Sequence, residues 1–388
     1  MKFSPTRFAS SCYGCHQINV ILKGELRMAG TIYDGARKWL VQTAIYKNFR
    51  KLQSTKDVPK FSVIKSRQGS KQKSIVFLCP SIDTPMGGIK VIYRQSAIIN
   101  EMKGQLAASV LHPLNPDFSC TWFTNDVTKK TDLVFDQQHD FVLIPEFWAV
   151  PYARLLHKIG VRYGIYVQGG YIISRNSGAE LDDAYNNSSL ILAISDDTLE
   201  CIRMAFPESA SKVFRVHCSI NPEKFASSPQ KENIISYMPR RLKNHSQLVT
   251  FYLQKMIPPN WQITSIDGLN EDGVASILGK SKIFLSFSEL EGFSLPPLEA
   301  ALSGCQVIGY TGEGAKEYWD EEIFTEIYSG DIKAFVKAVM NKVDEIDSSA
   351  YKTNSVAINK LAIRYSAQVE QADMQFVAKK ILGILNGV

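Results

Sequence analysis

Two glutamates, Glu291 and Glu299, lie eight positions apart in the stretch "SELEGFSLPPLEAALSGCQVIGY". Gly292 permits a tight turn that brings the backbone close to a ligand, and "LPPLEAALSG" predicts a helix with prolines near its first turn. The N-terminus of such a helix carries unpaired N–H groups and a partial positive charge, which suit a phosphate group. Carboxylates beside that phosphate are suited to accept hydrogen bonds from sugar hydroxyls. The spacing therefore indicates a site for a nucleotide sugar.

The elements around this stretch are expected to place it at the edge of a parallel sheet. The apolar run "KIFLSFS" predicts a strand directly before the turn, and ligands of open α/β sheets bind outside the carboxyl ends of such strands. From residue 74 onward, strand-like and helix-like segments alternate, which implies a parallel sheet with helices on both faces. The expected strands of the first half are 74–81, 141–148, 163–170, 190–195 and 212–218.

The length of 388 residues is too great for one ordinary core. We expect a basic N-terminal extension and linker over 1–73, a Rossmann-like acceptor domain over 74–228 and a Rossmann-like donor domain over 229–388. A second series of strands and helices begins near Asn233 and ends in a long amphipathic helix, "QVEQADMQFVAKKILGIL". The apolar share of 45% and the charged share of 21% are those of a globular protein and exclude a disordered chain.

The N-terminal extension carries an excess of positive charge. Residues 1–73 hold fifteen Lys and Arg and three Asp and Glu, a net charge of +12, whereas the whole chain has +6. Within it, Val41, Ile45 and Phe49 recur at helical spacing among basic residues. Two interpretations stay open: this basic amphipathic helix contacts an anionic membrane surface, or its apolar stripe packs on the protein's own core.

The remaining compositional signals favour the cytoplasm. No apolar run approaches the ~20 residues that span a bilayer, and the N-terminus lacks the apolar segment of a signal peptide. The seven cysteines are scattered, as buried free thiols in a reducing compartment would be. Cys12, Cys15 and His16 match the spacing of c-type haem attachment. Since that chemistry needs an exported chain, a chance match or a weak metal site is the favoured interpretation.

The stretch "ELEGFSLPPLEAALSGCQVIGYTGEGAKE" resembles the E-x7-E signature of family 4 retaining glycosyltransferases, which have the GT-B fold. Their usual form is roughly E-G-F-G-L-P-x-L-E-A-M-A-x-G-x-P-V-I, followed by Gly-Gly-x-x-E. This chain departs at Ser294, at Gln306 and at Gly312-Glu313-Gly314, and none of these changes removes a needed charge. Glu317 falls where the later acid of the family falls.

The resemblance implies roles for the residues of the motif. Glu299 would bind the donor ribose and Glu291 the donor sugar. The residues that follow Glu291 would line the donor site: Gly292, Phe293, Ser294 and Leu295.

Weaker patches of resemblance lie elsewhere. "PSIDTPMGGIKVIYRQ" is similar to the N-domain glycine loop of the family, here Gly87-Gly88, which would approach the donor. After "ISYM" the family places an Arg and a Lys that grip the diphosphate, and these would be Arg240 and Lys243, with Arg241 as a competitor for Arg240.

Three residues of the first half are weaker candidates for the cleft. Gln168 and Gly169 lie in "IYVQGGY", where the family often has a polar group near the donor sugar. Glu146, at the end of the strand-like run "LIP", is a candidate for the acceptor side.

The resemblance implies transfer of a sugar from a UDP-, GDP- or dTDP-linked donor to a glycan or lipid-linked glycan, with retention at the anomeric carbon. The patches are most similar to transferases of bacterial surface polysaccharides, including rhamnosyltransferases. We expect no cofactor, no metal and no nucleic-acid partner, because the chain has no D-x-D motif and its six histidines show no ligand spacing. Catalysis would rest on Glu291, Arg240 and Lys243. The alternatives are a nucleotide-sugar epimerase, a phosphorylase and a non-catalytic sugar-binding protein.

Overall fold

The computed structural model describes residues 60–64, 72–176, 178–349 and 351–387. The chain divides into two compact units, Met1–Ser54 and Thr55–Val388, and only the second contains described residues. The expected amphipathic helix near Val41 and the group of Cys12, Cys15 and His16 therefore lie outside the described residues. Within the described part of the chain, no helix is both long and apolar enough to cross a bilayer.

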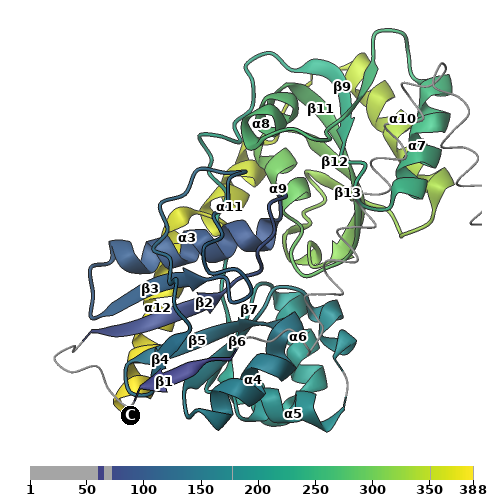
Figure 1. Cartoon of the computed structure of the whole chain (residues 1–388). Coiled ribbons are helices and arrows are strands. Elements are labelled where there is room, and N and C mark those ends of the chain that lie inside the picture. The colour runs from purple at the N-terminus through teal and green to yellow at the C-terminus, as the bar shows by residue number, and fades with distance from the viewer. Residues whose placement is uncertain (1–59, 65–71, 177, 350, 388) are drawn as a thin grey trace, which may run out of the picture. The chain divides into compact units, whose positions relative to one another are not determined.

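Two parallel sheets form the framework of the second unit (Figure 1). The first sheet has six strands in the order β3-β2-β5-β6-β7-β8. Its strands are β2 (Lys73–Leu78), β3 (Leu106–Leu111), β5 (Asp140–Pro145), β6 (Arg162–Val167), β7 (Leu190–Ala193) and β8 (Val213–Arg215). The second sheet has the order β10-β9-β11-β12-β13. Its strands are β9 (Glu232–Tyr237), β10 (Gln262–Ser265), β11 (Ser281–Glu291), β12 (Gln306–Glu313) and β13 (Phe324–Glu326).

Helices connect the strands, as parallel pairing requires. The first domain contains α3 (Gly87–Glu101), α4 (Ala149–Lys158), α5 (Ala179–Asn186) and α6 (Asp196–Ala205). The second contains α7 (Lys243–Met256), α8 (Glu271–Lys280), α9 (Leu295–Leu302), α10 (Ile332–Ser348) and α11 (Ser355–Arg364), and the chain ends in α12 (Ala367–Asn386). Short 3₁₀ turns are η2 (Glu146–Trp148), η3 (Gly170–Arg175), η4 (Pro207–Lys212) and η5 (Lys316–Tyr318). The alternation of strands and helices expected from the sequence is confirmed.

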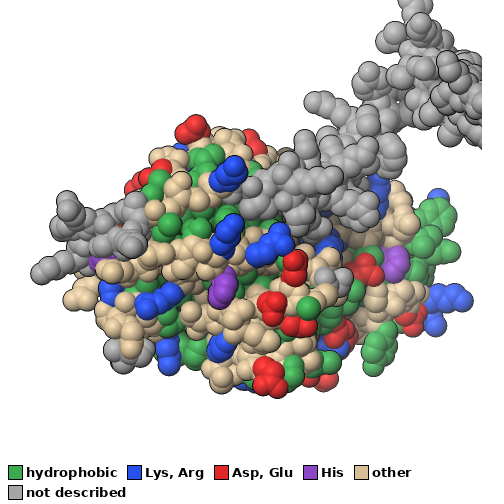
Figure 2. Space-filling model, turned by 60° about the horizontal axis from the view of Figure 1, so that its bottom comes forward, with side chains coloured by type: hydrophobic (Ala, Val, Ile, Leu, Met, Phe, Trp, Pro, Cys, Tyr) green, Lys and Arg blue, Asp and Glu red, His purple; other side chains and the backbone are tan. Residues whose placement is uncertain are grey.

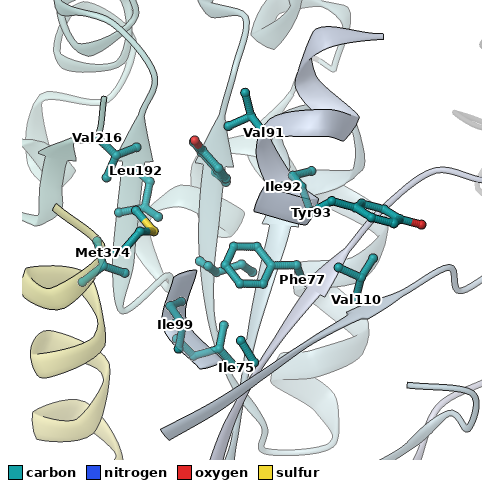
Figure 3. Close-up of a cluster of buried hydrophobic side chains, with 14 of the residues drawn as sticks. Ile75, Phe77, Val91, Ile92, Tyr93, Ile99, Val110, Leu192, Val216 and Met374 are labelled. Atoms are coloured by element: carbon teal, nitrogen blue, oxygen red, sulfur yellow. The ribbon is translucent and has the colours of Figure 1, made fainter. Parts of the chain in front are cut away.

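The C-terminal helix packs on the first domain, although the sequence analysis places it in the range of the second. Met374, Val377 and Ile381 of α12 are buried in the same cluster as residues of β2 and α3. Figure 3 shows Met374 pointing toward Leu192 and Val216 in this cluster. The amphipathic pattern of the helix was recognised correctly, but periodicity alone does not say which sheet a helix covers.

The expected linker contains a short strand. Ser62–Ile64 forms β1, which pairs in parallel with β4 (Val134–Asp136). Phe61 is buried, and its ring lies 4.8 Å from that of Phe135 and 5.6 Å from that of Tyr152. The sequence did not predict this strand, because the residues around it are polar and only one aromatic residue, Phe61, makes the buried contact.

Each sheet has one point at which the strand order reverses. In the first sheet it lies between β2 and β5, and in the second between β9 and β11. In open α/β sheets the loops that leave neighbouring strands at such a point run in opposite directions, and ligands bind in the crevice between them. Gly87-Gly88 follows β2, Arg240 follows β9 and Gly292 follows β11. Three of the predicted motifs therefore lie at the two reversal points.

Candidate active site

The first domain contributes the loops after β2, β5 and β6. The amide of Gln168, just after β6, donates to the carbonyl of Gly88 at 3.2 Å. A Cβ on Gly88 would lie only 2.4 Å from the Gln168 side-chain oxygen, and one on Gly87 would lie 2.9 Å from Leu295 of the second domain. Both contacts are with the ends of side chains, which would have to move if either glycine had a Cβ, and the structure brings the predicted residues Gly87, Gly88 and Gln168 together.

The turn after β11 meets these loops from the second domain. A Cβ on Gly292 would lie 2.1 Å from the carbonyl oxygen of Gln168 and 2.9 Å from the Cα of Gly169. A Cβ on Gly314 would lie 2.3 Å from the carbonyl oxygen of Gly292. Because these contacts are with backbone, no rotamer change could relieve them. Gly292 therefore lets the two domains approach at this point, and Gly314 lets the end of β12 lie close to the turn after β11.

Basic residues follow β9, which borders the strand-order reversal of the second sheet. Arg240 donates to the carbonyl of Pro85, two residues before Gly87, at 2.9 Å. Arg241 forms an ion pair with Glu291, with Nε 2.8 Å from Oε1, and a second hydrogen bond of 3.3 Å to Oε2. Lys243 is exposed at the first position of α7. Arg241 thus holds the carboxylate of Glu291, and Arg240 lies close enough to affect its pKa.

Local backbone strain is concentrated at the ends of these strands. Four non-glycine residues of the described chain have positive φ, and three of them flank the site: Leu242 (41°), Leu290 (46°) and Glu313 (67°). Such backbone conformations cost about 1–3 kcal/mol each and persist where the surrounding structure enforces them. The register of β11 against β12 also shifts between Ser288 and Glu291. Beyond this shift Glu291, the last residue of β11, still pairs with Glu313 of β12.

The two motif glutamates have different electrostatic surroundings. Burial raises the pKa of Glu291, and the nearby Arg241 and Arg240 oppose that rise. Burial raises the pKa of Glu299 to about 7, with Lys90 and Arg94 opposing it. For both carboxyl groups the rise in pKa caused by loss of water is larger than the fall caused by the nearby cations. A ligand hydroxyl that donates to either carboxylate would stabilise its ionised form.

Lys90 is a residue near the site that the sequence analysis did not single out. It lies in the first turn of α3, directly after the glycine loop, and forms an ion pair with Glu271 at the start of α8. Lys224 holds the same carboxylate from 2.9 Å. Lys90 also lies close enough to Glu299 to affect its pKa. No sequence motif identifies Lys90, because its partner Glu271 lies 181 positions further along the chain.

The residues after Gly292 pack into the protein. The ring of Phe293 lies 5.5 Å from those of Tyr318 and Tyr365. Ser294 is only 4% exposed, its hydroxyl lies 2.7 Å from that of Ser288, and its carbonyl accepts the hydroxyl of Tyr318. The side chains of Phe293 and Ser294 therefore fix the start of α9 by packing, and what they can offer a ligand is backbone.

Glu146 lies beneath the loop after β6. Its side chain is 2% exposed, and burial raises its pKa to about 7, while hydrogen bonds from the backbone of residues 146, 168 and 169 oppose the rise. One carboxylate oxygen, Oε2, has no hydrogen-bond partner among the described residues. The carboxylate of Glu146 therefore accepts hydrogen bonds from the backbone of Gln168 and Gly169. Its expected place on the acceptor side stays a prediction.

Glu317, the later acid of the resemblance, is tied into the protein. Its Oε1 lies 2.6 Å from a guanidinium nitrogen of Arg215 and accepts the hydroxyl of Tyr365 at 2.8 Å. Its Oε2 accepts the N–H of Asp196, at the start of α6, at 2.7 Å. Because Arg215 and Asp196 belong to the first domain, this carboxylate joins the two domains.

No protein-family model matches the chain. An α-1,6-glucosyltransferase of Actinobacillus pleuropneumoniae serotype 7 is 28% identical over 131 residues, which cover 32% of this chain and 40% of that protein. The chain thus matches well under half the length of this curated relative.

Solved structures are similar over most of the chain. Sucrose-phosphate synthase from Thermosynechococcus elongatus has a TM-score of 0.61 at 11% identity, and the match covers 81% of this chain and all (100%) of that one. HepE of Anabaena, in complex with UDP-glucose, has a TM-score of 0.58 at 12% identity, covering 80% and 100%. A glycosyltransferase of Rickettsia africae has a TM-score of 0.58 at 15% identity, covering 81% and 99%. At these identities the likeness shows the fold. The chain has the GT-B fold with two Rossmann-like domains, which confirms the fold expected from the sequence.

Proposed function

We propose that this chain is a glycosyltransferase that moves a sugar from a nucleotide-sugar donor to a glycan or lipid-linked glycan. The observation that carries the proposal is the meeting of the two strand-order reversals. The glycine loop after β2, Arg240 after β9 and the Glu291-Gly292 turn after β11 meet in one region, which we propose as the donor crevice. The GT-B fold and the partial match to a glucosyltransferase support it.

The donor proposed first is a UDP-sugar, since one structural neighbour has UDP-glucose bound. As the glycosidic bond breaks, negative charge grows on the β-phosphate of the leaving group. Arg240 and Lys243 would stabilise this charge together with the positive end of α9. Glu299 would accept hydrogen bonds from the ribose, and Glu291, oriented by Arg241, would bind the donor sugar. As family 4 enzymes do, this chain would retain the anomeric configuration and use no metal.

The proposed reaction route depends on whether a carboxylate near the crevice can act as a nucleophile. A double displacement would need a nucleophilic carboxylate beneath the sugar ring. Glu291 is held by Arg241, and Glu146 lies below the loop with 2% exposure. Attack by the acceptor hydroxyl on the same face as the leaving group is therefore the proposed route. The acceptor belongs to a bacterial surface polysaccharide in this proposal.

Binding is tested by thermal shift with UDP, GDP, dTDP and UDP-glucose, because a ligand of the native state raises the melting temperature. Donor turnover is then followed by NMR without acceptor, which separates hydrolysis from epimerisation of the sugar. We expect Glu291→Ala and Lys243→Ala to lose donor turnover by orders of magnitude while keeping the wild-type melting temperature. Wild-type turnover in either purified variant would remove that residue from the mechanism. Ligand binding with no turnover of any donor would favour a sugar-binding protein.

A further inference from the structure

The first turns of α3 and α9 lie against each other where the two domains meet. A Cβ on Gly87, at the start of α3, would lie 2.9 Å from a methyl carbon of Leu295, at the start of α9. Since residues three or four positions apart share one face of a helix, Lys90 lies on the same face of α3 as Gly87. Glu299 likewise shares a face of α9 with Leu295, and Lys90 and Glu299 are close enough for each to affect the pKa of the other.

The carboxylate of Glu299 has little support from the protein. It forms no hydrogen bond with any residue that the structure describes, and burial raises its pKa to about 7. Lys90 opposes this rise more than Arg94 does. The guanidinium of Arg94 is held elsewhere, because it donates to both carboxylate oxygens of Glu370, at 2.7 and 3.0 Å. Lys90 is therefore the principal counter-charge of the carboxylate that is proposed to bind the donor ribose.

A second carboxylate fixes the position of Lys90. Lys90 forms an ion pair with Glu271, at the start of α8. Lys224 lies 2.9 Å from the same carboxylate and 3.0 Å from that of Asp272, so Glu271 keeps a cation even without Lys90. Figure 2 shows basic and acidic side chains close together on one face of the molecule, and surface ion pairs of this kind contribute little to stability. The feature that sets Lys90 apart is therefore its second acidic neighbour, Glu299.

We propose that Lys90 is a positioning residue of the donor site, which keeps the carboxylate of Glu299 ionised for the ribose hydroxyls of a nucleotide. An ionised carboxylate has two acceptor oxygens and no donor, so it can accept hydrogen bonds from two neighbouring hydroxyl groups. A protonated carboxyl group loses part of that capacity. The inference rests on the proposed function, because it extends the part given there to Glu299, and it gives the first domain a part in ribose binding.

The effect of removing Lys90 follows from the ionised fraction of Glu299. With a pKa of about 7, this carboxyl group is about half ionised at pH 7. Loss of a nearby opposite charge raises the pKa of a carboxyl group by about one unit or more, which would leave about a tenth or less of Glu299 ionised. Because an apparent dissociation constant scales inversely with the competent fraction, binding through the ribose should weaken about fivefold or more.

The test measures dissociation constants of the full-length protein at pH 7 by calorimetry. The ligands are UDP, GDP and dTDP, each beside the 2′,3′-dideoxy form of the same nucleotide, whose sugar has no free hydroxyl. We expect Lys90→Met to weaken binding of the hydroxyl-bearing nucleotide about fivefold or more and to leave binding of its dideoxy form within about twofold. Lys90→Arg, which keeps the charge, should bind both forms like the wild type. The matched control is Lys224→Met, because Lys224 holds the same Glu271 carboxylate but is not among the cations that lower the pKa of Glu299; it should also bind like the wild type.

A double variant shows whether Lys90 acts through Glu299. Once Glu299→Gln has removed the charge, Lys90→Met should cause no further loss of affinity, because the two residues act as one unit. An additional loss in the double variant would overturn the proposal. Equal weakening of both nucleotide forms by Lys90→Met would also overturn it, because Lys90 would then act on the diphosphate. An equal loss in Lys224→Met would do the same, because both lysines would then only link the domains through Glu271.

Failure of the proposed function gives a different result. A wild-type protein that binds none of the three nucleoside diphosphates would refute the proposed function, and this inference with it. In every outcome that overturns the role of Lys90 alone, including wild-type affinity of Lys90→Met for both nucleotide forms, the wild-type protein still binds a nucleotide.

Discussion

Substitution of Gly292 by alanine tests whether the meeting of the two domains matters for activity. The added Cβ would lie 2.1 Å from the carbonyl oxygen of Gln168, 2.8 Å from its carbonyl carbon and 2.9 Å from the Cα of Gly169. A carbon and a carbonyl oxygen in contact are normally about 3.3–3.6 Å apart. All three clashing atoms belong to backbone, so the turn after β11 and the loop after β6 must separate by about 1 Å.

A displacement of this size has different consequences for activity and for stability. A misplacement of about 1 Å in a catalytic arrangement can lower the rate by about 10²-fold, which corresponds to about 2.7 kcal/mol of transition-state stabilisation. The free energy of unfolding should fall by about 1–3 kcal/mol, as for other overpacked positions. We therefore expect kcat/KM for donor turnover to fall by about 10²-fold in a protein that still folds.

The assay follows release of the nucleoside diphosphate, because it needs no acceptor. Gly104→Ala is the matched control, since a Cβ there meets nothing within 4 Å, and it should keep wild-type activity. Wild-type kcat/KM in a folded Gly292→Ala variant would refute the idea that this contact positions the site.

If the Gly292→Ala variant does not fold, the variant Gly88→Ala is used in its place. Its clash is with the side chain of Gln168, so Gln168→Ala added to it should restore the melting temperature, and a double variant no more stable than Gly88→Ala would contradict the geometry.

Three further predictions follow from the site. Lys243→Ala should lower kcat for donor turnover by about 10²–10³-fold, the loss seen when one group that stabilises developing charge is removed; a change in KM alone, measured by initial rates, would contradict this. Glu317→Ala should destabilise the fold by about 3 kcal/mol in urea unfolding, because it leaves Arg215 (12% exposed) with only the more distant carboxylate of Asp196, 3.4 Å away. The donor dissociation constant should stay within about threefold, and the reverse pattern would make Glu317 a ligand. The pKa of Glu146 is raised from 4.5 to about 7, so the folded state binds its proton more tightly than the unfolded state. Stability should thus fall as the pH rises from 4.5 to 7, by up to about 3 kcal/mol. Glu146→Gln should remove this part of the pH dependence, and identical pH profiles of the unfolding free energy would refute the assignment.

Local patterns predicted the strands and glycine turns well, because each depends on neighbouring residues. The strand before Gly292 and the helix after it follow from an apolar run, a glycine and prolines. Contacts between segments far apart in sequence left no such pattern. The packing of α12 on the first domain, the ion pair of Lys90 with Glu271 and the tether at Glu317 all join residues more than 100 positions apart. Only the folded chain brings them together.

Electrostatic roles were also harder to predict than positions. The sequence presents Arg240, Arg241 and Lys243 as near-equivalent cations after one strand. Folding distinguishes them: Arg241 forms the ion pair with Glu291, and Arg240 reaches the carbonyl of Pro85. The reason is geometric, since consecutive residues after a strand end point in different directions. Residue types and spacing thus predict that basic side chains follow this strand. Which of them forms an ion pair with Glu291 depends on the path of the backbone.

The sequence at the start of α9 limits how many backbone donors the proposed donor site can offer a diphosphate. Pro296 and Pro297 both lie in the first turn of this helix, whose N–H groups are those that a helix leaves unpaired. Proline has no N–H, so Leu295 is left as the principal amide of that turn, together with the residues just before it. A helix end with fewer donors can hold a diphosphate less well by hydrogen bonds. In the proposed mechanism Arg240 and Lys243 must therefore stabilise a larger share of the leaving-group charge than they would beside a helix with free amides.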